Sequence, residues 1–281
     1  MTMSSATMYG RIAVDTALGP LRGRPADLPD RERVSTGVTV DRDALAAYDR
    51  VCGFRLSDTL PATYPHVLAF PLAMELMAAG DFPFGVLGLV HVANAIEQLR
   101  PLDAGEPFDL RVWAENLAQH PRGRTVDLVA EATVDGEVAW RDRSTYLHRE
   151  AGGGGAKKGP RDGEPPRTQA EWSVPGDTGR RYAAVSGDRN PIHLHGVPAR
   201  LFGQKGAIAH GMWSKARCLA ALEPLPAAYA VEVAFKLPIL LPAKVAFASW
   251  VDDTERRFAL HDARTGKPHL EGGITPAAPA V

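Results

Sequence analysis

Two stretches of this chain match each other in residue type and spacing. They are DRDALAAYDRVCGF (41–54) and DTGRRYAAVSGD (177–188). Tyr, Val and Gly recur in both at identical intervals (Tyr48, Val51 and Gly53; Tyr182, Val185 and Gly187). Each stretch is typical of a short helix, with Asp41 or Asp177 as the N-cap and a left-handed Gly after the last turn. The chain is therefore expected to consist of two related halves.

The segments that follow these helices also correspond. YPHVLAFPLAMELMAAG (64–80) and IAHGMWSKARCLAALEPLP (208–226) each have a His near the start and are apolar on nearly every face, which predicts a buried helix. Both halves then continue in alternating segments such as TVDLVAEATV and VEVAFKL, with turns at 135–136 and 264–267, which predict antiparallel hairpins. The expected class is α+β: in each half a sheet wraps around one central helix, and the two sheets join as a pseudodimer.

Domain limits follow from the Gly- and Pro-rich stretch between the halves. We expect an N-terminal domain at 1–150, a linker at 151–169 and a C-terminal domain at 170–281. Two cysteines, Cys52 and Cys218, fit a reducing compartment, and the N-terminus shows no secretory signal, so the cytoplasm is expected. The net charge of -1 and the lack of a long apolar run favour neither nucleic acid nor a membrane as a partner.

The motif SGDRNPIHLHG (186–196) occurs only in the second half. From the shared Gly to the shared His there are 13 positions in the first half and 23 in the second, so the motif lies in an insertion. Pro191 disfavours the helical conformation at Asn190, and the resulting turn lets Asp188 and His193 converge on one point. General acid/base catalysis on water is one interpretation of this pair.

Other interpretations of the motif stay open at this point. An ordinary structural turn explains D-x-N-P equally well. A zinc site of His193, His195 and His210 is possible if H-x-H lies on a strand. A calcium loop is excluded, because Ala199 stands where the twelfth-position Glu is required. Between positions 180 and 217 there are seven basic residues and one acid, a net charge of +6, which favours an anionic ligand or a solvated basic face.

A second feature is AHGM (209–212), at the start of the second apolar helix. Gly211 has no Cβ, so a ligand could approach its backbone N–H closely, and an N–H at a helix N-terminus is a donor to developing negative charge. Close packing of the helix against a neighbour is the alternative reason for a glycine here.

Taken together, SGDRNPIH, AHGM and VAFKLP at this spacing resemble the MaoC-like, (R)-specific enoyl-CoA hydratase family (hydratase 2), whose two-domain members have a double hot-dog fold. The resemblance implies that Asp188 and His193 are catalytic and that Asn190 and Gly211 bind substrate, with no metal or organic cofactor. The first half has Phe54 in register with Asp188, so its own site is expected to be degenerate. Its missing insertion leaves room for an acyl chain, with Met74, Met77 and 82–90 as candidate lining.

The activity implied by the resemblance is reversible hydration of trans-2-enoyl thioesters to (3R)-3-hydroxyacyl thioesters in fatty-acid metabolism. The expected partner is an acyl-CoA or acyl-carrier-protein thioester, and the expected assembly is a monomeric pseudodimer or a homodimer. An acyl-thioesterase or a non-catalytic acyl-thioester binder on the same scaffold is the alternative. Some members have H-L-D-P where this chain has H-L-H-G and a helix Ser where it has Leu219, so chain preference stays open.

Overall fold

The computed structural model describes residues 24–86, 88–150, 167–196, 199 and 205–276. Its elements in the first half are β1 (Glu32–Val38), α2 (Arg42–Cys52), α3 (Tyr64–Met77), β2 (Leu89–Gln98), β3 (Phe108–His120), β4 (Gly123–Val134) and β5 (Glu137–Arg149). Those in the second half are β6 (Ala170–Val174), α4 (Thr178–Ser186), α5 (Pro191–Leu194), α7 (Gly211–Leu222), β7 (Tyr229–Phe235), β8 (Ala243–Asp252), β9 (Glu255–Asp262) and β10 (Pro268–Pro276).

All described strands belong to one ten-stranded antiparallel sheet in the order β1-β3-β4-β5-β2-β7-β10-β9-β8-β6. Outward from the centre, the strand order of the first half, β2-β5-β4-β3-β1, corresponds strand by strand to that of the second half, β7-β10-β9-β8-β6. The halves join where β2 pairs with β7, with Ala93 opposite Ala234 and Gln98 opposite Tyr229. This arrangement confirms the predicted repeat and the predicted joining of two sheets.

The edge strands β1 and β6 were not among the predicted elements. Each pairs on one side only, β1 with β3 and β6 with β8. Their segments, ERVSTGV and AEWSV, are short and half-exposed, so they lack the long apolar alternation of a central strand. The predicted linker at 151–169 lies mostly outside the described residues.

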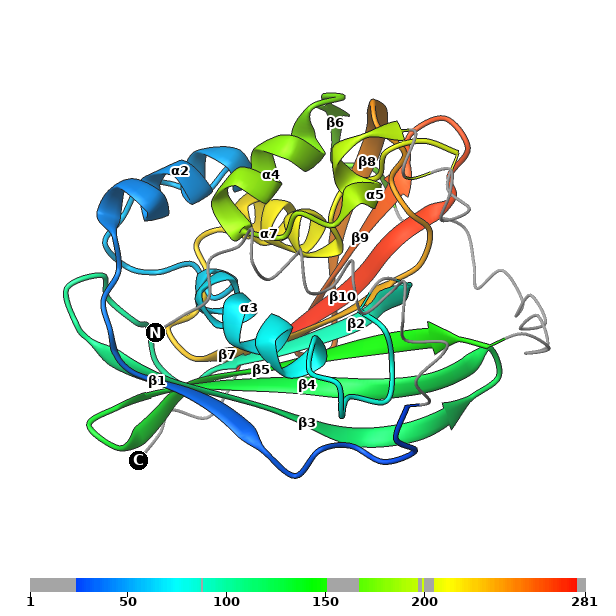
Figure 1. Cartoon of the computed structure of the whole chain (residues 1–281). Helices are drawn as coiled ribbons and strands as arrows, with labels where there is room; N and C mark the ends of the chain where they lie inside the picture. The colour runs from blue at the N-terminus through cyan, green and yellow to red at the C-terminus, as the bar shows by residue number, and fades with distance from the viewer. Residues whose placement is uncertain (1–23, 87, 151–166, 197–198, 200–204, 277–281) are drawn as a thin grey trace.

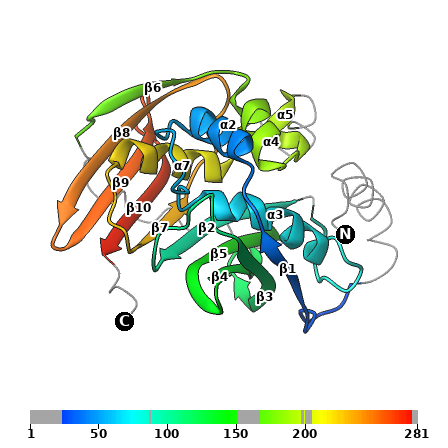
Figure 2. The same ribbon diagram turned by 90° about the vertical axis from the view of Figure 1, so that its left-hand side faces the viewer.

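One long helix lies in the concave face of each half of the sheet, α3 in the first and α7 in the second (Figures 1 and 2). Both are buried on most sides, as their apolar sequences predicted. The shorter α2 and α4 lie side by side above them, and the repeated Tyr48 and Tyr182 contact each other there with ring centroids 6.2 Å apart. The two copies of the repeated motif therefore meet at the pseudo-twofold axis.

The helix ends follow the predicted signals with one exception. The side chain of Asp41 accepts hydrogen bonds from the backbone N–H of Asp43 and Ala44, whereas the side chain of Asp177 makes no capping bond. Gly53 and Gly187 end α2 and α4 with φ of 85° and 74°, a conformation that disfavours residues with a Cβ.

No helix in the described part of the chain is long and apolar enough to cross a bilayer.

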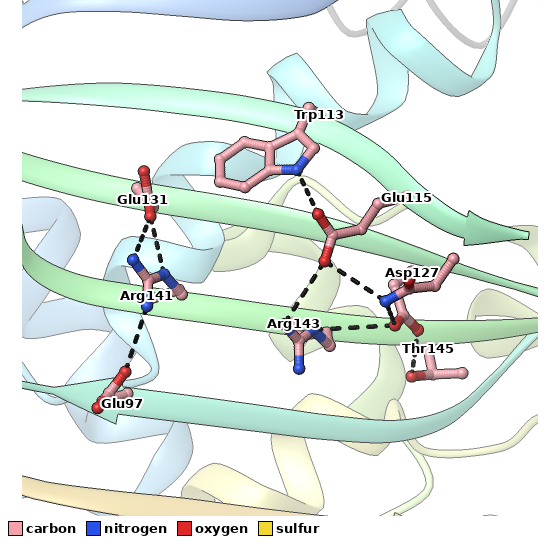
Figure 3. Close-up of polar contacts among 9 residues, drawn as sticks. Glu97, Trp113, Glu115, Asp127, Glu131, Arg141, Arg143 and Thr145 are labelled. Carbon is pink, nitrogen blue, oxygen red and sulfur yellow. Dashed lines mark hydrogen bonds and ion pairs between the residues drawn. The ribbon is translucent and has the colours of Figure 1, made fainter. Parts of the chain in front are cut away.

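The outer face of the first-half sheet is covered by rows of charged side chains (Figure 3). Arg141 on β5 lies between Glu131 on β4 and Glu97 on β2, with its Nε 2.8 Å from Glu131 and its Nη1 3.6 Å from Glu97. Arg143 pairs in the same way with Asp127 and Glu115. Since this face is polar and the other holds the helices, the apolar interior and the pocket lie on the concave side.

Candidate active site

The turn between α4 and α5 is held by its own polar side chains. Asn190 is the N-cap of α5, and its Oδ1 accepts from the N–H of Ile192 at 3.3 Å. The N–H of Asn190 donates to Asp188 Oδ1 at 3.1 Å, and the N–H of Asp188 donates to Ser186 Oγ at 3.2 Å. Asn190 has ψ of 124°, outside the helical region, as the following Pro191 predicts. Asp188 is thereby fixed at the start of the insertion.

His193 is in the single turn of α5, and its ring is oriented by a backbone carbonyl. Nδ1 lies 2.8 Å from Ile208 O. Because a carbonyl can only accept, Nδ1 is the protonated nitrogen, which leaves Nε2 to exchange a proton with a ligand. Asp188 and His193 both line one pocket, so the structure brings the predicted pair together.

His210 also belongs to this group, although the sequence suggested it only as a zinc ligand. Its ring stacks on that of His193 with centroids 3.7 Å apart. Its Nε2 donates to the backbone carbonyl of Asp188 at 3.0 Å and lies 3.6 Å from Asp188 Oδ2. The available signal was the correspondence of His210 with His66 in the repeat, which indicated a structural position without indicating its contacts.

The surroundings set opposite charge states for the acid and the imidazoles. Burial by itself would raise the pKa of Asp188, but His210, His193 and the N–H of Asn190 outweigh it, and the net shift is downward. Burial lowers the pKa of His193, with Asp188 opposing, and lowers that of His210 to about 3, reinforced by His193. At neutral pH the site therefore contains a carboxylate beside two neutral imidazoles, one of which can accept a proton.

Gly211 is the first residue of α7, and its N–H is one of the four that a helix leaves without an internal partner. It lines the same pocket as Asp188 and His193. A Cβ at this position would lie 3.1 Å from two ring carbons of Phe235 and 3.2 Å from a third. Gly211 therefore packs tightly against Phe235, and the role of its N–H as a donor to a ligand stays a prediction.

The pocket has a volume of about 220 Å³ and is lined by both halves of the chain. The first half contributes His66, Val67 and Phe70 from α3, together with residues at the start of β2 and the end of β5. Of the predicted acyl-chain lining, Leu89 and Val90 face this pocket. Met74 and Met77 do not line it, because their helix turns them into the core, where they are almost fully buried.

The zinc hypothesis fails on geometry. His195 ends a helical turn and is exposed, so it is not paired with His193 on a strand. Ligand atoms of Asp188, His193 and His210 lie within 4.8 Å of one another. His195 is not part of this group, so the predicted set of His193, His195 and His210 is not brought together.

The predicted basic patch at 180–217 is only partly on the surface. Lys215 is fully buried, and the guanidinium of Arg217 lies over the ring of Trp172 at 4.2 Å. Lys215 points inward because α7 is the central helix of its half, whereas Arg217 is only partly buried. Basic residues instead line the pocket from other elements, namely Arg122, Arg149 and Lys236.

Comparison with known proteins agrees with this fold and shows the family. Residues 157–272 match the family described as MaoC-like domain, and this chain belongs to the MaoC-like dehydratase family. A 3-hydroxyacyl-thioester dehydratase X of Mycobacterium tuberculosis is 38% identical over 259 residues, which cover 91% of this chain and 92% of the relative. The crystal structure of HtdX from that organism has a TM-score of 0.79 at 37% identity, covering 88% of this chain and 100% of the other.

A more distant M. tuberculosis structure, described as having a double hot-dog fold, has a TM-score of 0.53 at 12% identity and covers 88% of this chain and 96% of its own. At that identity the similarity concerns the fold alone. Together with the continuous sheet and the two central helices, it confirms the predicted double hot-dog architecture.

Proposed function

We propose that this protein interconverts trans-2-enoyl and (3R)-3-hydroxyacyl thioesters by adding or removing water, in fatty-acid metabolism. The convergence of the Asp188 carboxylate, the His193 imidazole and the Gly211 N–H on one pocket is the observation that carries the proposal. The 38% identity to a 3-hydroxyacyl-thioester dehydratase supports it. Asn190 supports the site by fixing the turn from which Asp188 and His193 project.

The geometry suggests how the reaction proceeds. In hydration, the Asp188–His193 pair takes a proton from water as the water oxygen bonds to C3 of the enoyl group. The electrons of the double bond move toward the thioester carbonyl, whose oxygen gains negative charge next to the Gly211 N–H. The pair then delivers a proton to C2, so one water has been added. Dehydration follows the same steps in reverse.

We propose that the acyl group is bound through a thioester bond to a carrier with a phosphorylated arm, either CoA or an acyl-carrier protein. Arg122, Arg149 and Lys236 line the pocket together with the catalytic turn, and cationic side chains there would attract the phosphates of CoA or the acidic surface of an acyl-carrier protein. One chain supplies both walls of the pocket, so we propose that a single chain is the working unit, in the cytoplasm, where its buried free thiols Cys52 and Cys218 stay reduced.

The direct test is incubation of the purified protein with crotonyl-CoA while the enone absorbance is followed. A hydratase lowers the absorbance without releasing thiol. Release of free CoA would indicate a thioesterase instead, and binding without any absorbance change would indicate an acyl-thioester carrier. Either of these results would contradict the proposal.

A further inference from the structure

The part of the pocket wall that comes from the half without the motif is polar. His66 in the first turn of α3, His91 on β2 and Tyr146 on β5 all line the pocket. The rings of His66 and Tyr146 both stack on that of His91, with centroids 6.3 Å and 4.6 Å away. An acyl chain that enters this half would therefore meet imidazole and phenol groups.

A buried carboxylate orients His66. Asp142 on β5 is 2% exposed, and its Oδ2 lies 2.5 Å from His66 Nδ1. The amide of Asn94 donates to the other carboxylate oxygen and, at 3.0 Å, to Ser144 Oγ. Because the carboxylate accepts the Nδ1 proton, Nε2 is the nitrogen of His66 left for a ligand in the pocket.

A lysine from the catalytic half completes this network. Lys215 on α7 is 0% exposed, and its Nζ donates to Asn94 Oδ1 at 2.5 Å, Asn94 O at 3.4 Å and Val231 O at 3.2 Å. Burial lowers the pKa of Lys215 to about 7, with Asp142 and Glu232 opposing the shift. The network joins α7 of one half to β2 and β5 of the other.

The polar wall is continuous with the thioester end of the site. His91 contacts Phe235 edge to face with centroids 4.9 Å apart, and Phe235 is the ring against which Gly211 packs. The Nε2 atom of His91 is buried and has no hydrogen-bond partner among the described residues. A plain alkyl chain would remove water from His66 Nε2 and leave both nitrogens unpaired, which is costly.

We propose that His66, oriented by Asp142, binds a hydroxyl group on the acyl chain, so that the preferred substrates are enoyl thioesters with a further oxygen beyond the reacting carbons. A hydroxyl both donates and accepts, and it therefore matches an imidazole nitrogen that is held in place by a carboxylate. This inference rests on the proposed function for the chemistry at the reacting carbons. According to this inference, the first half of the chain determines which acyl chains are preferred as substrates.

Two measurements test the inference in the full-length protein. The first is the dissociation constant of octanoyl-CoA, an unreactive saturated thioester, compared with a series carrying one hydroxyl at successive carbons beyond C3. The second is kcat/KM for the matching series of trans-2-octenoyl-CoA. Three variants are compared. His66→Leu removes the imidazole nitrogen that would bind the hydroxyl, and Asp142→Asn removes the carboxylate that orients the His66 ring. Val67→Ala is a control at an adjacent apolar residue that lines the pocket.

We expect at least one hydroxylated thioester to bind about tenfold more tightly than the parent, because a hydrogen bond to a buried nitrogen is gained. His66→Leu should remove this preference, Asp142→Asn should reduce it, and Val67→Ala should retain it. Equal affinity across the series, or a preference that survives in His66→Leu, would overturn the inference. If His66→Leu does not fold, Asp142→Asn carries the test, and a preference that is unchanged in that variant would overturn the inference.

The two proposals can fail separately. If the wild type shows the binding preference but does not hydrate crotonyl-CoA, the proposed function is wrong and the hydroxyl site stands. If His66→Leu lowers turnover of hydroxylated, plain and crotonyl substrates by the same large factor, His66 belongs to the reaction chemistry, and its assignment to chain recognition is wrong.

Discussion

Replacing Gly211 by Ala tests whether the start of α7 contributes a donor to the reaction. The new Cβ would lie 3.1 Å from Cε1 and Cζ of Phe235 and 3.2 Å from Cδ1. Carbon atoms in favourable contact are about 3.5–4.0 Å apart, so ring and helix must separate by about half an ångström. Neither moves freely, because Phe235 packs on His91 and α7 is anchored through Lys215.

Two consequences of this displacement can be measured. Overpacking of this size costs about 1–3 kcal/mol, which lowers Tm by several degrees in a chain of this size. Moving an N–H away from a developing oxyanion lowers kcat by about 10²-fold. Gly80→Ala is the matched control, since a Cβ there meets no atom within 4 Å. It should change neither quantity.

The assay is crotonyl-CoA hydration together with a thermal melt. In the double variant Gly211→Ala/Phe235→Leu the smaller side chain relieves the contact with the new Cβ, so part of kcat should be recovered. Comparison of the double variant with the two single variants, a double-mutant cycle, measures this coupling. A Gly211→Ala protein with lowered Tm but wild-type kcat would show that the glycine serves packing only, and the role assigned to its N–H would be refuted.

Three further predictions concern the histidines and metals. His210→Phe keeps the ring stacked on His193 but removes the donor to the Asp188 carbonyl; we expect a loss of about tenfold in kcat, and an unchanged rate would show that this bond does not position Asp188. Burial lowers the pKa values of His91 and His210 to about 3, and an unfolded histidine titrates near about 6.5. Protons therefore favour the unfolded state, and the urea midpoint should be constant above about pH 6.5 and fall as the pH decreases toward about 3; a midpoint that rises on acidification would contradict these shifts. Prolonged treatment with a chelator should leave crotonyl-CoA hydration unchanged, and a loss restored by zinc would reopen the metal hypothesis.

Most of the fold could be predicted because the same sequence pattern occurs in both halves of the chain. The matched Tyr, Val and Gly positions and the two apolar helices with a His near the start imply a pseudodimer. The two sheets join as predicted, and the structure places the join at β2 and β7. The edge strands β1 and β6 could not be predicted in the same way. A short strand that is paired on one side has too few buried positions to create a clear alternation.

The turn between α4 and α5, which we propose to be catalytic, could be predicted because its residues lie close together in sequence. Asp188, Asn190 and His193 interact over a few positions, and the effect of Pro191 on the backbone is local. The partners of His66 are different, since Asp142 is 76 residues away and Asn94 and Lys215 are 121 residues apart. Only the folded sheet brings them together, so the sequence showed Lys215 as one of several surface charges.

The most direct test of the central claim is the hydration of crotonyl-CoA by the wild type, Asp188→Asn and His193→Ala, with folding verified by the thermal melt. Because proton transfer by a positioned side chain contributes about 10²–10⁴-fold, each variant should lower kcat by at least about 10²-fold. His195→Ala is the control, since His195 is exposed at the end of the same turn, and it should retain wild-type kcat. Folded Asp188→Asn and His193→Ala proteins that both turn over at nearly the wild-type rate would contradict the proposed mechanism.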